Sequence, residues 1–165
     1  MRLVLAGLPA TWRPDPASAG GAVLRAPEGL VLHVAGLVPV PADYIGAQEE
    51  LLRLGVPSGG TLRVHEDLLG ETDLGWPMRR VLTEVVDPEG RVLEVRLHAF
   101  YQFLYYAAHA VAVSPDPAVL RAHLPLLTEA LGRGRPDWRS DQVVAVEEIF
   151  SFEVEAAGST MVSGP

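Results

Sequence analysis

The sequence contains no cysteine among its 165 residues. This absence excludes disulfide bonds, thiol nucleophiles, thiolate zinc sites and iron–sulfur clusters held by cysteine. Lysine is also absent, and the 13 basic residues, all arginine, are scattered from Arg2 to Arg139 in a chain of formal net charge −8. Such an acidic surface repels a phosphate backbone, so the composition argues against a nucleic-acid partner.

Long apolar runs are missing as well. The opening run Leu3–Leu8 ends at Pro9 and is shorter than the roughly 7–15 apolar residues of a secretory signal core, so it predicts a first strand. Proline, glycine or charged residues interrupt every other run before it reaches the roughly 20 residues that cross a bilayer. We therefore expect a soluble, cytoplasmic protein with no stable membrane insertion.

Length and composition favour one domain, because 165 residues with 48% hydrophobic content support one good core. We assign residues 1–155 to this domain and residues 156–165, rich in small residues, to a flexible C-terminal tail. Residues 141–155 leave two alternatives open. Phe152 and Val154 are apolar residues at alternate positions, which favours a strand, whereas Asp141 is a suitable cap for a short helix.

Several segments alternate apolar and polar residues, a pattern typical of β-strands that bury one face. The turn sequence Pro27-Glu28-Gly29 predicts a hairpin, and Asp87-Pro88-Glu89-Gly90 joins the two longest strands into an antiparallel meander. Leu62, Val64 and Leu68 share one parity, which predicts a half-buried strand. Strands are predicted at 22–26, 30–38, 62–68, 78–86, 91–104 and 106–113.

The strand at 91–104 has the clearest alternation. One face carries apolar residues and the other carries mostly polar ones, so one side is expected in a core and the other in a wetter environment. The next segment, 106–113, is apolar apart from His109, which predicts a central strand covered on both faces. The apolar face of 91–104 comprises Leu93, Val95, Leu97, Ala99, Tyr101 and Phe103, and the opposite face comprises Glu94, Arg96, His98, Phe100 and Gln102.

Two helices complete the predicted fold. The first begins near Pro41 and ends before Gly55, with Tyr44, Ala47, Leu51 and Leu54 at helical spacing. The second begins at residues 114–117 and continues to residue 131, with a kink expected near residue 125, a proline. The fold class is therefore α+β: a single-domain α/β sandwich in which an antiparallel sheet of about six strands carries two main helices.

Motifs for catalysis and metal binding are absent. The five histidines His33, His65, His98, His109 and His123 include no helical HExxH pair, and a solvent-facing or hydrogen-bonded role accounts for each. The sequence has no Gly-x-Ser-x-Gly elbow and no glycine-rich phosphate loop followed by lysine. We therefore predict no catalytic residue, no metal and no cofactor, and expect that the protein is not an enzyme.

Tryptophan and arginine often dominate protein interfaces, which makes Trp76, Arg79 and Arg80 candidates for partner binding. Phe100 shares a strand face with polar residues, where a partner chain would bury it. Each candidate has a structural alternative: Trp76 plugs the end of the sheet, the arginines are solvated, and Phe100 packs against a helix. The predicted partner-binding residues are Trp76, Arg79, Arg80, Arg96, His98, Phe100 and Gln102.

The order of elements resembles the PsbP-like fold and, within it, the DcrB-related proteins, which include the Eag chaperones that hold effectors for type VI secretion. The resemblance covers about residues 1–150 in layout and rests on Leu74-Gly75-Trp76-Pro77 and on Arg96–Ala108. It implies a sandwich without catalytic machinery, often a homodimer, whose sheet surface offers a groove. The guest of an Eag chaperone is an apolar helical segment, but Glu94 and His98 flank Phe100, which favours a protein partner over a membrane helix.

We therefore expect a non-enzymatic adaptor or chaperone that holds a partner chain, such as a secreted effector, on a sheet face. The alternative is a small-ligand or lipid-binding domain with a pocket between sheet and helix. An enzyme built on histidines and carboxylates is a third, less favoured interpretation.

Overall fold

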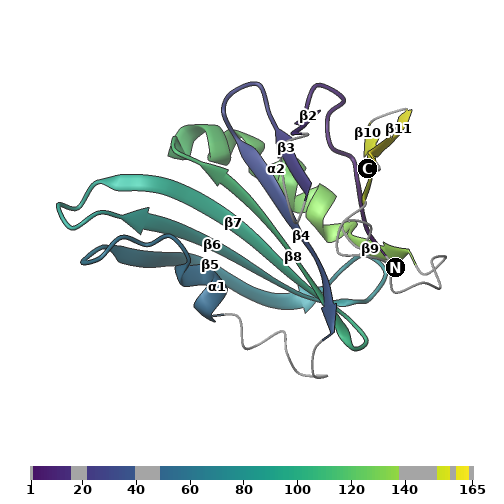
Figure 1. The fold of residues 1–165 in the computed structure, drawn as a ribbon, viewed down its shortest axis with the longest axis horizontal. Coiled ribbons are helices and arrows are strands. Elements are labelled where there is room, and N and C mark those ends of the chain that lie inside the picture. Colours follow the sequence, from purple (N-terminus) through teal and green to yellow (C-terminus); the bar gives the residue numbers. More distant parts are fainter. Residues whose placement is uncertain (1, 16–21, 40–48, 138–151, 157–158, 164–165) are drawn as a thin grey trace.

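The computed structural model describes residues 2–15, 22–39, 49–137, 152–156 and 159–163. Its main feature is a seven-stranded antiparallel sheet with the order β2-β3-β4-β8-β7-β6-β5 (Figure 1). The strand order confirms the predicted meander and the central position of β8. The strands are β2 (Arg13–Pro14), β3 (Ala22–Arg25), β4 (Val31–Pro39), β5 (Thr61–Glu71), β6 (Pro77–Val86), β7 (Val92–Phe103) and β8 (Tyr106–Ser114).

Turn residues fix the two predicted hairpins. Gly29, at the β3–β4 turn, and Gly90, at the β6–β7 turn, have φ of +83° and +88°, a backbone conformation that glycine adopts without the strain of a side chain. The Asp87 carboxylate accepts hydrogen bonds from the backbone N–H and the side chain of Arg91. The β6–β7 register that follows places Phe100 opposite Arg79, and the β7–β8 register places it opposite His109.

Helix α2 (Pro117–Gly132) covers one face of this sheet. Asp116 caps its first turn by accepting a hydrogen bond from the N–H of Ala118, and Pro117 occupies a first-turn position that needs no donor. The predicted second helix is thus confirmed, with Pro125 inside it. Its buried residues Leu120 and Leu127 join the main core, which includes Leu97, Ala99, Tyr101 and Phe103 of β7.

A second sheet has the order β11-β10-β1-β9. Strand β1 (Arg2–Ala6) confirms the predicted first strand, and it pairs with β9 (Arg135–Asp137) and β10 (Phe152–Ala156). The strand alternative is therefore correct for Phe152 and Val154, while residues 141–151 lie outside the described residues. Within the expected flexible tail, β11 (Ser159–Ser163) forms by antiparallel pairing with β10, so backbone pairing offsets the weak propensity of its small residues.

Helix α1 (Glu49–Arg53) lies on the opposite side of the seven-stranded sheet from α2 (Figure 1). Leu52 is buried against Val81 and Phe100, with Leu51 packed at the edge of the cluster. Leu54, predicted on the apolar face of this helix, is 62% exposed because it follows the last helical residue. Residues 41–48 of the predicted helix, including Tyr44 and Ala47, lie outside the described residues.

The fold class is therefore α+β, with a large antiparallel sheet and a helix packed on each face. The main sheet has seven strands rather than about six, since two residues are too few for β2 to show a period in the sequence. Within the described ranges, no helix is long and apolar enough to cross a membrane.

Close packing behind α2 generates a stability prediction. A Cβ added at Gly134 would lie 2.7–2.9 Å from ring atoms of Tyr101, and the buried Tyr101 hydroxyl donates a hydrogen bond to Leu131 O, so the ring has little room to move. We expect Gly134→Ala to lower the free energy of unfolding by about 1–3 kcal/mol, measured by urea denaturation. Gly70→Ala is the control, because a Cβ there meets nothing within 4 Å. Equal effects of the two substitutions would contradict the packing argument.

Candidate functional site

The face of the seven-stranded sheet that α1 covers, called here the α1 face, carries most of the predicted partner-binding residues. The register confirms the predicted parity along β7, because alternate residues from Glu94 to Gln102 lie opposite the α1-face residues of β6 and β8. This face combines charged, imidazole and aromatic groups under one short helix. Its main members are Arg79, Val81 and Thr83 from β6, Arg96, His98, Phe100 and Gln102 from β7, and His109 from β8.

Three rings on the α1 face form a parallel arrangement, called here the ring stack: His98, Phe100 and His109. Their planes lie within 5–7° of one another, with centroids 4.5 Å apart for Phe100 and His109 and 5.2 Å for the two imidazoles. His98 Nδ1 lies 3.0 Å from His109 Nε2, so a single proton between them makes one ring the donor and the other the acceptor. Within the described residues, the buried His98 Nε2 has no hydrogen-bond partner.

The environment of the ring stack favours neutral imidazoles. Burial, together with the neighbouring His109 and the guanidinium groups of Arg96 and Arg79, lowers the pKa of His98 to about 3. Burial and the nearby His33 lower the pKa of His109 to about 4. Burial also lowers the pKa of His33, the third imidazole on this side. Burial penalises the charged form of each imidazole, which is why the neutral forms are favoured.

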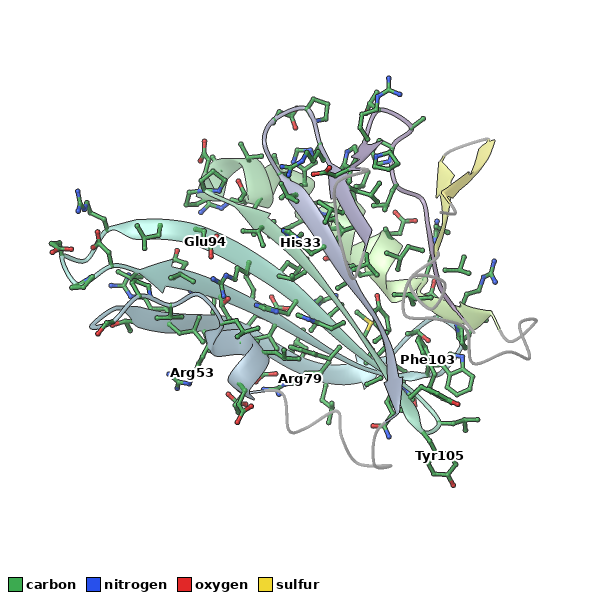
Figure 2. The ribbon with its side chains drawn as sticks, viewed as in Figure 1. His33, Arg53, Arg79, Glu94, Phe103 and Tyr105 are labelled. Carbon is green, nitrogen blue, oxygen red and sulfur yellow. The ribbon has the colours of Figure 1, made fainter. Side chains whose placement is uncertain are left out.

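Two buried arginines attach α1 to the sheet. The Arg79 guanidinium donates to Glu49 Oε1 of α1 at 3.0 Å and to both carboxylate oxygens of Asp67 in β5 at 2.8–2.9 Å; Figure 2 shows Arg79 beside α1. Arg96 donates to the Glu94 carboxylate and to the backbone carbonyls of Leu52 and Leu54. These hydrogen bonds satisfy charges that burial would otherwise make unfavourable.

Packing against α1 leaves little of the predicted partner-binding face accessible. Phe100 is 1% exposed and His98 is 2% exposed. Gln102, also buried, donates a hydrogen bond to Leu104 O. Phe100 packs against a helix, which is the structural alternative to partner binding, because its side chain clusters with Leu52 of α1. The predicted partner role of these residues stays a prediction and would require α1 to move.

Trp76 and Arg80 belong to the other side of the sheet. Arg80 is opposite Ala99 of the α2-facing core row, and its guanidinium pairs with Glu66 at 3.1 Å. Trp76, half-buried, packs edge-on against Phe103 with centroids 5.6 Å apart, as expected for a residue that plugs the sheet end. The seven predicted residues therefore do not form one surface: five lie on the α1 face and two on the opposite side. Neither arginine of the pair is simply solvated, since both form ion pairs.

The outer edge of β5 is the surface that the sequence pattern missed. β5 ends the sheet order, and its side chains are almost all exposed along 11 residues. Val64, Leu68 and Leu69 are 52%, 48% and 71% exposed. A register shift between Val64 and Glu66 puts Val64 opposite Thr83 and Leu68 opposite Arg80, on different faces. The predicted strand is confirmed, but its burial on one face and the placing of Val64 and Leu68 together on that face are wrong, because a bulge breaks the period of two.

Among the residues that the structure describes, no group of three histidine, aspartate or glutamate side chains is arranged to hold a metal ion. The arrangement therefore offers two features of different kind: a closed polar face beneath α1 and an open apolar strand edge. The strand at 62–68 and its position after a glycine-rich loop were visible in the sequence, whereas its continuation to Glu71 was not. Its place at the end of the sheet was not, because the pairing partners of a strand are not encoded in its own alternation.

Comparison with known proteins identifies the fold. No protein-family model and no curated protein matches the chain. The solution structure of cyanobacterial PsbP (CyanoP) from Synechocystis sp. PCC 6803 is similar, with a TM-score of 0.59 and 12% identity over 79% of this chain and 84% of that chain. Protein PA94 from Pseudomonas aeruginosa, of unknown function, gives a TM-score of 0.48 and 18% identity over 76% and 81%. The chain has a PsbP-like fold, as its sequence predicts.

The neutral ring stack predicts acid sensitivity. In the unfolded chain an imidazole has a pKa of about 6.5, above the values of about 3 and about 4 in the fold. The stability contributed by neutral His98 and His109 is therefore full above about pH 6.5 and declines as the pH falls below it. Lowering the pH from 7 to 5 should cost about 2 kcal/mol of unfolding free energy for each imidazole, measured by urea denaturation.

The matched variant replaces both members of the hydrogen-bonded pair. His98→Phe combined with His109→Phe keeps ring packing and removes both titrations, so the loss between pH 7 and 5 should shrink by more than half. If the double variant is as acid-sensitive as the parent, the ring stack does not control the acid response.

Proposed function

We propose that this protein is a non-enzymatic protein-binding adaptor or chaperone that holds an extended segment of a partner chain along the outer edge of β5. The observation that supports this proposal is the exposure of that edge. An unpaired edge strand presents backbone N–H and C=O groups that can pair with another chain. Peptide-binding domains use such edges by strand addition, with alternate side chains supplying specificity.

The chemistry of β5 is suited to pairing with another chain. Folded proteins usually protect a long edge with charged residues, proline, a bulge or a covering segment; β5 has one bulge, between Val64 and Glu66, and contains no proline. The carboxylates of Asp67 and Glu66 are paired with Arg79 and Arg80 of β6. Because those charges are compensated within the sheet, the exposed apolar side chains determine what the edge attracts.

The occupant that fits this edge is an extended protein segment with apolar side chains at alternating positions. On the α1 side of the strand it would contact Val64 and Leu69, which pair with Thr83 and Arg79. On the other side it would contact Leu68. The net charge of −8 disfavours a strongly acidic partner, and the same repulsion disfavours a second copy of this chain at the β5 edge, so a homodimer would use another surface.

The resemblance to known families implies three more specific properties, which are part of this proposal. They are membership of the DcrB-related proteins, an Eag-type role in holding a type VI secretion effector in the cytoplasm, and a homodimer. For that role, the geometry supports binding of an extended guest along β5 rather than binding of a helical guest on the α1 face. An apolar helical guest on the α1 face would have to displace α1 and its arginine hydrogen bonds, whereas an extended guest on β5 displaces nothing that the structure describes.

A second candidate function, binding of a small ligand or lipid, is favoured by one observation. A cavity of about 140 Å³ lies between α2 and the sheet, on the face opposite α1. Its apolar walls come from both layers, as expected for a pocket between sheet and helix.

The edge proposal predicts that a charge on β5 removes a bound partner. The bait protein, incubated with lysate of its own cells, should retain a chain that is lost with Leu69→Lys and with Val64→Lys. A lysine directed into the contact blocks strand addition, and both side chains are exposed enough for the fold to tolerate the change within about 0.5 kcal/mol. Leu104→Lys, at a 60% exposed leucine in the β7–β8 turn beside Tyr105 (Figure 2), is the matched control and should retain the chain.

Amide hydrogen exchange on the purified complex then locates the contact. Binding through the edge should slow exchange in β5 and leave α2 unchanged. The proposal is wrong if retention is indifferent to both β5 substitutions, or if protection appears on the α1 face instead. If the complex depends on β5 but contains only this chain, the occupant of the edge is a second copy of the chain and not a segment of another protein.

A further inference from the structure

The cavity between α2 and the sheet is half-open, with apolar side chains from both layers and polar groups in its lining. Leu82 of β6 and Val95 of β7 form its sheet side, and Leu120 and Leu124 of α2 form its helix side. Its volume of about 140 Å³ is close to the roughly 150 Å³ of an engineered apolar cavity that binds benzene. An apolar group of about six carbon atoms therefore matches its size.

The mouth of the cavity is polar and its charges are unevenly compensated. The Glu84 carboxylate contacts His65 Nε2 at 3.2 Å and lies 3.8 Å from Arg63 Nη1, so its negative charge is locally offset. Arg121 of α2 also lines the cavity, and it is exposed and forms no ion pair with any described residue. Arg121 is thus a guanidinium that no described residue compensates, in a protein of net charge −8.

We propose that this cavity binds a small anionic amphiphile: a carboxylate attached to an apolar group of about six carbons. The apolar group occupies the space between Leu82 and Leu124, and the carboxylate pairs with Arg121 at the mouth. A guanidinium binds a carboxylate with directional, charge-assisted hydrogen bonds. This inference deepens the small-ligand function and is independent of binding at the β5 edge.

The test is a titration of the full-length protein with hexanoate, followed by amide chemical shifts in two-dimensional NMR. We expect shifts at residues of β6, β7 and α2 that line the cavity, with a Kd of about 1 mM, as befits a ligand of this size. 1-Hexanol should bind about tenfold more weakly and hexylamine more weakly still. Arg121→Gln should weaken hexanoate about tenfold and leave 1-hexanol unchanged, because the exposed side chain contributes its charge and not the apolar walls.

Two further variants separate the possible failures. Arg53→Gln removes an exposed arginine on the α1 side and should change nothing. Leu124→Trp fills the cavity and should abolish binding of both hexanoate and 1-hexanol. If hexanoate and hexylamine bind equally, or if Arg121→Gln has no effect, the anionic assignment is wrong although the cavity binds ligands. If none of the three compounds shifts the cavity residues, both this inference and the small-ligand function are overturned.

Discussion

The Arg79 guanidinium joins three elements, and the two surfaces of functional interest depend on it. Its side chain is 9% exposed, and its hydrogen bonds reach Glu49 in α1 and Asp67 in β5. The hydrogen bonds that Arg79 donates to Asp67, and then the one it donates to Glu49, raise the pKa of Arg79. The hydrogen bond from Arg79 also lowers the pKa of Asp67, so the charged pair is the favoured form. A buried guanidinium without such partners would be strongly destabilising, which makes the positions of α1 and β5 mutually dependent.

One consequence is a closed face. With α1 held by Arg79 and Arg96, Leu52 covers Phe100, and Phe100 and His98 of the ring stack are removed from water while His109 is partly buried. Burial in turn keeps His98 and His109 neutral and hydrogen-bonded to each other. The polar residues of this face are therefore explained by the architecture of a sheet that is covered on both sides, one side by apolar packing and the other by compensated charge.

The other consequence is an open edge, because β5 is fixed as the last strand with its outer side exposed.

The alternation along β7, the apolar run of β8 and the turn glycines specified the meander, because these features depend on local period and local backbone conformation. The role of Phe100 was not determined by the same alternation. Parity places it with Arg96 and His98, but whether that face meets solvent, a partner or a helix depends on the position of α1. The bulge at Val64 and Glu66 and the pairing of β1 with β9 and β10 were likewise hidden, since the first interrupts a period and the second joins distant segments.

Amide hydrogen exchange of the purified protein without a partner tests most directly the claim that one face is closed and one edge is open. Amides of β7 and β8 should exchange only through global unfolding, while alternate amides on the outer side of β5 should exchange more than about 100-fold faster. Uniform protection of β5 at the level of β7 would contradict the account, because it would mean that the edge is already covered in the isolated protein.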